Sequence, residues 1–149
     1  MTFLQAVDVP FVVPYMGMNK TAGNQGGVGL SFNPVTNMIV DYMTEPDYVI
    51  NGAIVIPYDF PSFQATIQGQ IYYSGGSFPK VTCRIRRNAA TLVTGSEVTT
   101  YPPAAAVAST TIMVNPGDTF DLYWQGEGSF FVRPSCVAGE NTYLKVIPV

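Results

Sequence analysis

The chain has 149 residues, of which 47% are hydrophobic and only 11% are charged, and its formal net charge is −3. An average soluble domain carries about 25% charged residues. This surface is therefore poor in charge, as expected either for faces that neighbouring molecules cover or for an inert secreted β domain. The acidic balance argues against a general nucleic-acid binder, which needs a basic face. At this length a single domain with a full core is expected.

The first 27 residues predict an extended arm and a Gly-rich loop. Residues 1–18 alternate loosely between apolar and polar, but Pro10 and Pro14 each remove a backbone donor, so an edge strand or an extended arm is expected. Residues 19–27 have little to bury and are typical of a flexible loop. An apolar arm followed by a tether suits a terminus that packs on another subunit, whereas the alternative is a first strand followed by a long hairpin loop. The candidate partner contacts are the apolar side chains of the arm: Phe3, Leu4, Val7, Val9, Phe11, Val12 and Tyr15.

The segment from residue 28 to residue 61 predicts short strands. Two are expected over 28–32 and 35–43, on either side of a turn at Asn33-Pro34, and an acidic turn follows over 44–47. Asn51-Gly52 lies between two apolar runs and is the strongest short-range signal for a hairpin. A bulge within one strand also fits this pair.

The remainder of the chain reads as a ladder of strands. β-Branched and aromatic residues are enriched in seven runs, and turn residues separate them. The expected strands cover 63–73, 80–87, 96–101, 109–114, 119–124, 129–133 and 142–147. Strand starts near ten-residue spacing, without a helical stretch between them, predict one all-β antiparallel domain over 28–149, either a sandwich or a barrel.

Alternation within three of these strands predicts which side chains face the core. One face of the run 80–87 carries Val81, Cys83 and Ile85. In the run 119–124 the inward set is Phe120, Leu122 and Trp124. The last run is apolar on both faces apart from Lys145, which favours a central position in a sheet or a place at an interface.

Residue types that commonly carry catalysis are scarce. The chain has no histidine, which removes the commonest general base and most zinc sites. Cys83 and Cys136 are expected to be free, buried thiols. Asp118 and Asp121 lack the spacing of a calcium loop and are expected to serve turns and strands. We therefore expect no enzyme, no catalytic residue, no cofactor and no metal.

One basic cluster remains, formed by Arg84, Arg86 and Arg87 with Lys80 nearby. Outward-facing arginines on a strand could pair with acids of a neighbouring subunit or grip an anionic glycan. A solvated strand face at a hairpin is the alternative. The N-terminus lacks the pattern of a signal peptide, and no run is long and apolar enough to span a membrane, so no membrane contact is expected.

Two short motifs carry a resemblance to a known family. Val114-Asn-Pro-Gly-Asp118 precedes one strand, and Thr142-Tyr-Leu-Lys-Val146 lies in the last. This pattern resembles the jelly-roll heads shared by tumour necrosis factor, the complement collagen-like proteins and many phage structural proteins. The resemblance covers a little over half of the chain. It implies an antiparallel jelly-roll β-sandwich and a homotrimer.

The resemblance also implies a function. A small product without a collagen repeat or a shaft is most similar to phage capsid decoration (cement) proteins of jelly-roll type. The chain is then expected on the exterior of a virion capsid, assembled in the host cytoplasm, with the major capsid protein and its own copies as partners. The alternative is a receptor-binding or carbohydrate-binding head of a phage fibre, whose partner would be a host-surface glycan.

Overall fold

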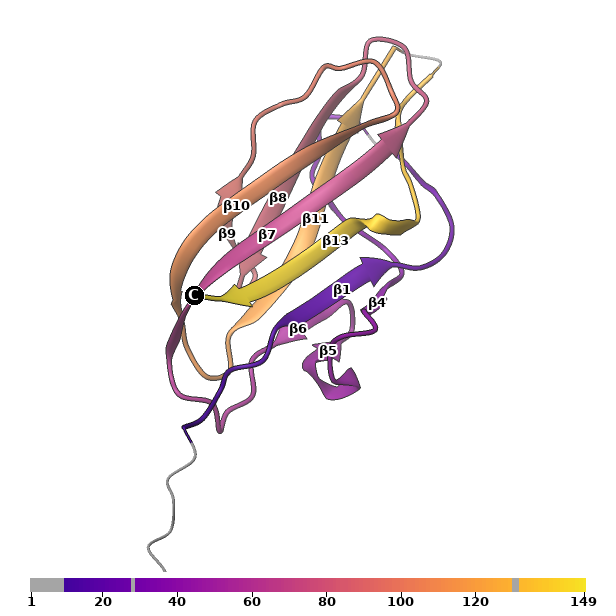
Figure 1. The fold of residues 1–149 in the computed structure, drawn as a ribbon. Helices are drawn as coiled ribbons and strands as arrows, with labels where there is room; N and C mark the ends of the chain where they lie inside the picture. Colours follow the sequence, from indigo (N-terminus) through magenta and orange to yellow (C-terminus); the bar gives the residue numbers. More distant parts are fainter. Residues whose placement is uncertain (1–9, 28, 130–131) are drawn as a thin grey trace, which may run out of the picture.

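Two antiparallel β-sheets pack face to face in the computed structural model, which describes residues 10–27, 29–129 and 132–149 (Figure 1). The first, which we call the β7 sheet, has the main order β10–β7–β13–β1–β4, and the short strands β12 and β2 pair beside the end of β7. The second, the β11 sheet, has the order β9–β8–β11–β6–β5, with β3 also paired to β11. The predicted all-β jelly-roll sandwich is confirmed.

The elements have the following bounds. In the β7 sheet the strands are β1 (Met16–Lys20), β2 (Gln25–Gly26), β4 (Met38–Val40), β7 (Phe63–Ser74), β10 (Ala104–Val114), β12 (Ser135–Cys136) and β13 (Gly139–Pro148). In the β11 sheet they are β3 (Asn33–Pro34), β5 (Val49–Ile50), β6 (Ala53–Val55), β8 (Lys80–Arg87), β9 (Ala90–Thr94) and β11 (Thr119–Glu127). Within the described ranges, one short 3-10 helix, η1 (Pro46–Tyr48), is present, and no helix is long and apolar enough to cross a membrane.

The core lies between the two sheets because alternate residues of each strand point inward. All six side chains predicted to face inward are buried: Val81, Cys83, Ile85, Phe120, Leu122 and Trp124. Gly69, at the centre of β7, occupies an inward position where a Cβ would lie 2.6 Å from Leu122 Cδ1. The absence of a side chain at Gly69 therefore lets the two sheets approach closely. The prediction for the last strand is also confirmed, because β13 is central, between β7 and β1.

Two predicted strands of the ladder are wrong. The segment 96–101 forms one isolated bridge, between Val98 and Val81, and the strand lies earlier, at β9. The hairpin before β9 is tighter than expected because Asn88 and Ala89 both adopt positive φ, which suits a two-residue turn. The run 129–133 is reduced in the described residues to a bridge between Ser129 and Val132.

Bounds in the segment before β7 also differ from the prediction. The Asn33-Pro34 pair, expected to be a turn, is itself strand β3. The runs 28–32 and 35–43 yield only the short β4 in the part that the structure describes. The expected hairpin at Asn51-Gly52 is confirmed, since both residues have positive φ and join β5 to β6.

The N-terminal region joins the sandwich earlier than expected. β1 lies between β13 and β4, with Met16, Met18 and Lys20 fully buried. The sequence predicts a loop at Lys20, because residues 19–27 have little to bury, and an ammonium is costly to bury. Its Nζ instead donates to Thr36 O at 2.8 Å and to Ala22 O at 3.3 Å, and burial lowers its pKa. The sandwich therefore includes residues 16–20, and the arm stays a prediction for residues 1–9, which lie outside the described residues.

Candidate interaction surfaces

The outer face of the β7 sheet is almost free of charge. Outward positions alternate with buried ones along its strands, and cross-strand pairs such as Tyr143 and Gln70 confirm that they share a face. Near its start β13 also exposes Glu140, and among the alternating outward positions of the described strands Lys145 is the one charged side chain. These positions are Gly17, Asn19, Ile39, Gln64, Thr66, Gln68, Gln70, Tyr72, Ser74, Ala105, Val107, Ser109, Thr111, Met113, Asn141, Tyr143, Lys145 and Ile147.

In the part of the chain that the structure describes, two acidic groups lie on this face beside β1. A hollow of about 290 Å³ there is lined by Asp41 and Glu140 together with three tyrosines. Tyr15 Oη donates to Asp41 Oδ2 at 2.7 Å, and burial together with this bond raises the pKa of the Tyr15 phenol. The Met43 amide donates to Asp41 Oδ1 at 3.0 Å. The Asp41 carboxylate is thus already occupied within the chain.

The outer face of the β11 sheet is charged and self-paired. Asp121 lies opposite Arg86, and Glu127 lies opposite Lys80, on the neighbouring strands β11 and β8. Arg86 donates two hydrogen bonds to Asp121, at 2.9 and 2.6 Å, and this pairing raises the pKa of Arg86. Its guanidinium also lies over the Tyr123 ring, 3.8 Å from the centroid. Cross-strand charges of opposite sign stabilise such a face without any partner.

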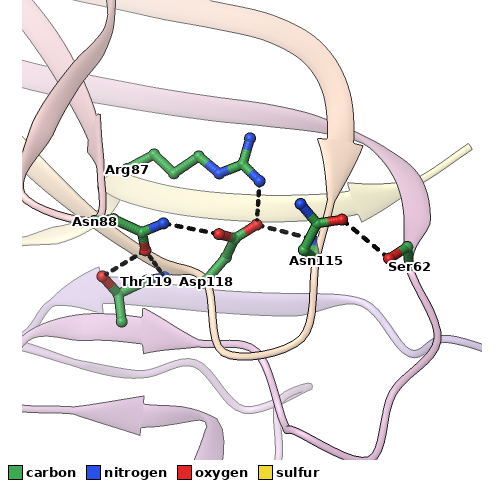
Figure 2. A network of polar contacts seen from close by, with 6 residues as sticks. All are labelled: Ser62, Arg87, Asn88, Asn115, Asp118 and Thr119. Atoms are coloured by element: carbon green, nitrogen blue, oxygen red, sulfur yellow. Dashed lines mark hydrogen bonds and ion pairs between the residues drawn. The ribbon is translucent and has the colours of Figure 1, made fainter.

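The third arginine of the predicted basic cluster is tied to a loop (Figure 2). Arg87 forms an ion pair with the buried carboxylate of Asp118, which also accepts hydrogen bonds from Asn88 Nδ2 and from the Asn115 amide. Burial alone would raise the pKa of Asp118, but these donors together lower it. Asp118, in the Val-x-x-Gly-Asp motif, therefore locks the β10–β11 turn to the β8–β9 hairpin.

The structure thus places Arg84, Arg86 and Arg87 in contacts within the chain. Arg84 lies over the Phe32 ring, 3.5 Å from its centroid, and its Nε donates to Thr94 Oγ1 at 3.0 Å. The sequence suggested a basic cluster that could bind an anionic partner. In the structure the three arginines already contact other residues of the same chain. The reason is the register of β8 against β11, which the sequence of β8 alone does not contain.

The predicted arm residues have mixed outcomes. Phe3, Leu4, Val7 and Val9 lie outside the described residues. Phe11 and Val12 are exposed, and one edge of the Phe11 ring packs on Phe60 with centroids 4.9 Å apart. Tyr15 is engaged with Asp41 as described above. Among the described arm residues, Phe11 and Val12 are therefore the ones exposed for contact with a partner.

Both cysteines are free and buried, as predicted. Burial raises the pKa of the Cys83 thiol to about 12 and that of Cys136 to about 11. Both sulfurs are therefore protonated at neutral pH. In the part of the chain that the structure describes, no three His, Cys, Asp or Glu side chains gather where they could hold a metal ion.

The end of the sandwich beyond β7 carries an aromatic hollow that the sequence analysis missed. Phe78 and Tyr101 are 89% and 80% exposed, and together with Ser77, Pro79 and Thr99 they line a hollow of about 270 Å³. The sequence predicts that Phe78 lies between the expected strands 63–73 and 80–87 and that Tyr101 ends the expected strand 96–101. The available signal was a bulky ring inside the turn sequence Ser74-Gly-Gly-Ser-Phe-Pro79.

Comparison with known proteins supports the fold class. No family model matches the chain, and no curated protein matches it. Solved structures do match, among them that of Eiger TNF from S. frugiperda, with a TM-score of 0.55 and 15% sequence identity over 92% of this chain and 94% of that one. The protein is therefore a jelly-roll sandwich of the tumour-necrosis-factor-like type. At this identity the likeness describes the fold alone.

Proposed function

We propose that this chain is a non-enzymatic virion structural protein, a capsid decoration protein that binds the lattice of the major capsid protein on the capsid exterior and stabilises the shell. The observation that carries the proposal is the outer face of the β7 sheet. It offers amides, hydroxyls and aromatic rings, and Lys145 and Glu140 are the charged side chains that its described strands expose. Such a face packs against protein at low desolvation cost, because few charges have to leave water.

The self-paired β11 face supports the same proposal from the other side. Arg86 pairs with Asp121 within the chain and Lys80 lies opposite Glu127, so charges of opposite sign face one another and this face suits exposure to water. The polarity of the two faces gives each copy one side for contact and one side for solvent. Burial of ~1,000–2,000 Å² is the expected scale of a specific contact. Self-association into a homotrimer in the host cytoplasm, before attachment to the shell, is part of the proposal.

The test has two parts. The mass of the purified chain in solution, measured by light scattering, is expected to be three times 16.1 kDa. The purified protein is also expected to co-sediment with shells assembled from the major capsid protein of the same virus, and to raise their thermal disruption temperature. The proposal would be contradicted if the chain is a stable monomer that does not bind such shells.

The contribution of the arm is tested by removing residues 2–9. A longer deletion through residue 18 would remove part of β1, which is an inner strand, and would unfold the sandwich. The shorter deletion leaves β1 intact and is expected to lower occupancy on shells. Undiminished occupancy would reject the arm while leaving the β7 face as the contact.

The second candidate function is a receptor-binding or carbohydrate-binding head of a fibre. The observation that favours it is the exposed aromatic hollow at the end of the sandwich. Location in the particle distinguishes the two functions, because a fibre head is found at fibre tips and a decoration protein on the shell.

A further inference from the structure

The loops at one end of the sandwich present two aromatic rings to solvent. Phe78 follows β7 and Tyr101 precedes β10, and the two line one hollow. Burying a large aromatic ring stabilises a fold, and an exposed ring forgoes that stabilisation. Two such rings on one hollow form an apolar patch with no role in the core.

The backbone conformation at Phe78 is also unfavourable for a residue with a large side chain. Its φ is +52°, in the left-handed region that glycine and asparagine occupy easily and that a bulky residue occupies at a penalty. Gly75 and Gly76, in the same loop, also have positive φ, so glycine is the residue type that this turn accommodates without strain. A phenyl ring at position 78 is therefore not a requirement of the fold. An outlier of this kind at an exposed site points to a ligand.

Both loops are held in place by the strands beneath them. Tyr73, fully buried at the end of β7, donates its hydroxyl to Thr100 O at 2.8 Å. Val98 and Val81 exchange two backbone hydrogen bonds, at 2.8 and 2.9 Å. On the other side, the Ser77 amide donates to Val132 O at 3.1 Å. The rings thus stand on a fixed backbone, so little conformational entropy is lost when a ligand binds.

The lining of the hollow selects the chemistry of the ligand. None of its five lining residues is charged, which disfavours an ionic ligand. The hydroxyls of Ser77, Thr99 and Tyr101 make no hydrogen bond to any described residue. The five lining residues of the hollow are too few for a protein interface, which takes ~20–30 residues from each partner. A ligand with an apolar face, a rim of hydroxyls and no charge matches all three features.

We propose that this hollow is a binding site for a neutral saccharide. The Phe78 and Tyr101 rings pack on the apolar C–H face of one or two sugar rings, and the hydroxyls of Ser77 and Thr99 bond the sugar hydroxyls. The site goes beyond attachment to a capsid. The loops that carry it lie at the opposite end of the sandwich from residues 10–15, where the described chain begins (Figure 1), so a copy held at that end still displays it.

The experiment screens the full-length protein on immobilised neutral glycans ending in glucose, galactose, mannose or N-acetylglucosamine, alongside sialylated and sulfated ones. The variants are Phe78→Gly, which suits the positive φ and is expected to keep the thermal unfolding midpoint, and Tyr101→Ser. The control is Tyr58→Ser, because Tyr58 is 84% exposed in the corner before β7. Neutral glycans are expected to bind, about tenfold or more weakly in each variant and unchanged in the control.

Several results would overturn the proposal. These are binding of no neutral glycan, binding of anionic glycans alone, and equal loss in the Tyr58→Ser control. A lipid surface is the remaining occupant for exposed rings, so co-sedimentation with phosphatidylcholine vesicles is measured in parallel. Vesicle binding that Phe78→Gly abolishes, without glycan binding, would assign the rings to lipid. Binding to capsid shells is expected to be the same for Phe78→Gly and wild type, which separates this site from the proposed attachment.

Discussion

The two outer faces of the sandwich differ in how much charge they carry. On the β11 sheet, Arg86 forms an ion pair with Asp121 across the strands and Lys80 lies opposite Glu127, so charges of opposite sign face one another. On the β7 sheet, the described strands expose Lys145 and Glu140 and otherwise amides, hydroxyls and apolar groups. The difference teaches that the low overall charge is not spread evenly. The charged side chains are concentrated on the β11 face, and the charge-poor β7 face is the one that we assign to contact with protein.

The largest expected effect comes from the carboxylate that ties the β11 face to its loops. Asp118→Ala leaves Arg87 without its partner and removes the acceptor of the Asn88 amide and the Asn115 amide. We expect a loss of ~3 kcal/mol in the free energy of unfolding, because Asp118 is buried and several donors lose their partner. Urea denaturation measures it. Asp47→Ala is the matched control, since Asp47 is exposed, and it is expected to change stability by less than ~0.5 kcal/mol.

The same carboxylate predicts a pH dependence. Its pKa is lower in the folded chain than in the unfolded chain, so its contribution is fully present above the unfolded value of ~4 and is lost as pH falls through the folded value. The stability difference between wild type and Asp118→Ala is therefore expected to be constant at neutral pH and to shrink below pH ~4. A difference that stays constant down to acid denaturation would mean that the carboxylate is not ionised in the fold.

The second prediction adds charge to the outer face of the β7 sheet. Gln68→Lys adds a cation directly opposite Lys145, on the neighbouring strand β13. Monomer stability is expected to fall by less than ~1 kcal/mol, as for like charges on paired strands. Association is expected to weaken about thirtyfold or more, because two unpaired ammonium groups would be buried at the contact. Analytical ultracentrifugation measures it. Thr91→Lys adds the same charge to β9 of the other sheet, and equal weakening there would remove the distinction between the faces.

The fold was predictable where local pattern and pairing agree. The bounds of β8 were predicted correctly because Val81, Cys83 and Ile85 alternate cleanly with polar residues. The strand expected over 96–101 fails because its β-rich residues run into Pro102 and Pro103, which lack amide donors, whereas the alanines 104–106 pair along β7 despite their weak β-propensity. Pairing partners overrode local propensity in both places.

The candidate surfaces were less predictable than the strands. The sequence located Arg84, Arg86 and Arg87 and their outward direction but not their partners, since Asp121 and Asp118 lie more than thirty positions away. It also gave no means of seeing that Phe78 and Tyr101, from different loops, line one hollow. Properties of a single strand were readable, whereas properties of two strands brought together by register were not.

The third prediction measures how far the β11 face satisfies itself. A double-mutant cycle of Arg86→Ala and Asp121→Ala is expected to give a coupling of ~1 kcal/mol, modest because about a quarter of each side chain is exposed. Association and shell binding should be unchanged in both single variants. If either variant loses its binding to shells, the ion pair contributes to attachment and the β11 face is not a solvent face.

The smallest expected effect concerns Lys145, the one cation that the described strands expose on the outer face of the β7 sheet. Its Nζ lies 4.1 Å from the centroid of the Tyr143 ring, and it forms no ion pair within the described residues. Lys145→Gln is expected to change monomer stability by ~0.5 kcal/mol or less, the scale of an exposed cation–π contact. Association should stay equal or tighten by up to about threefold, because an ammonium no longer has to be desolvated. A tenfold weakening would show instead that Lys145 finds a carboxylate on its partner, and the β7 face would then recognise charge in the way that the β11 face does within one chain.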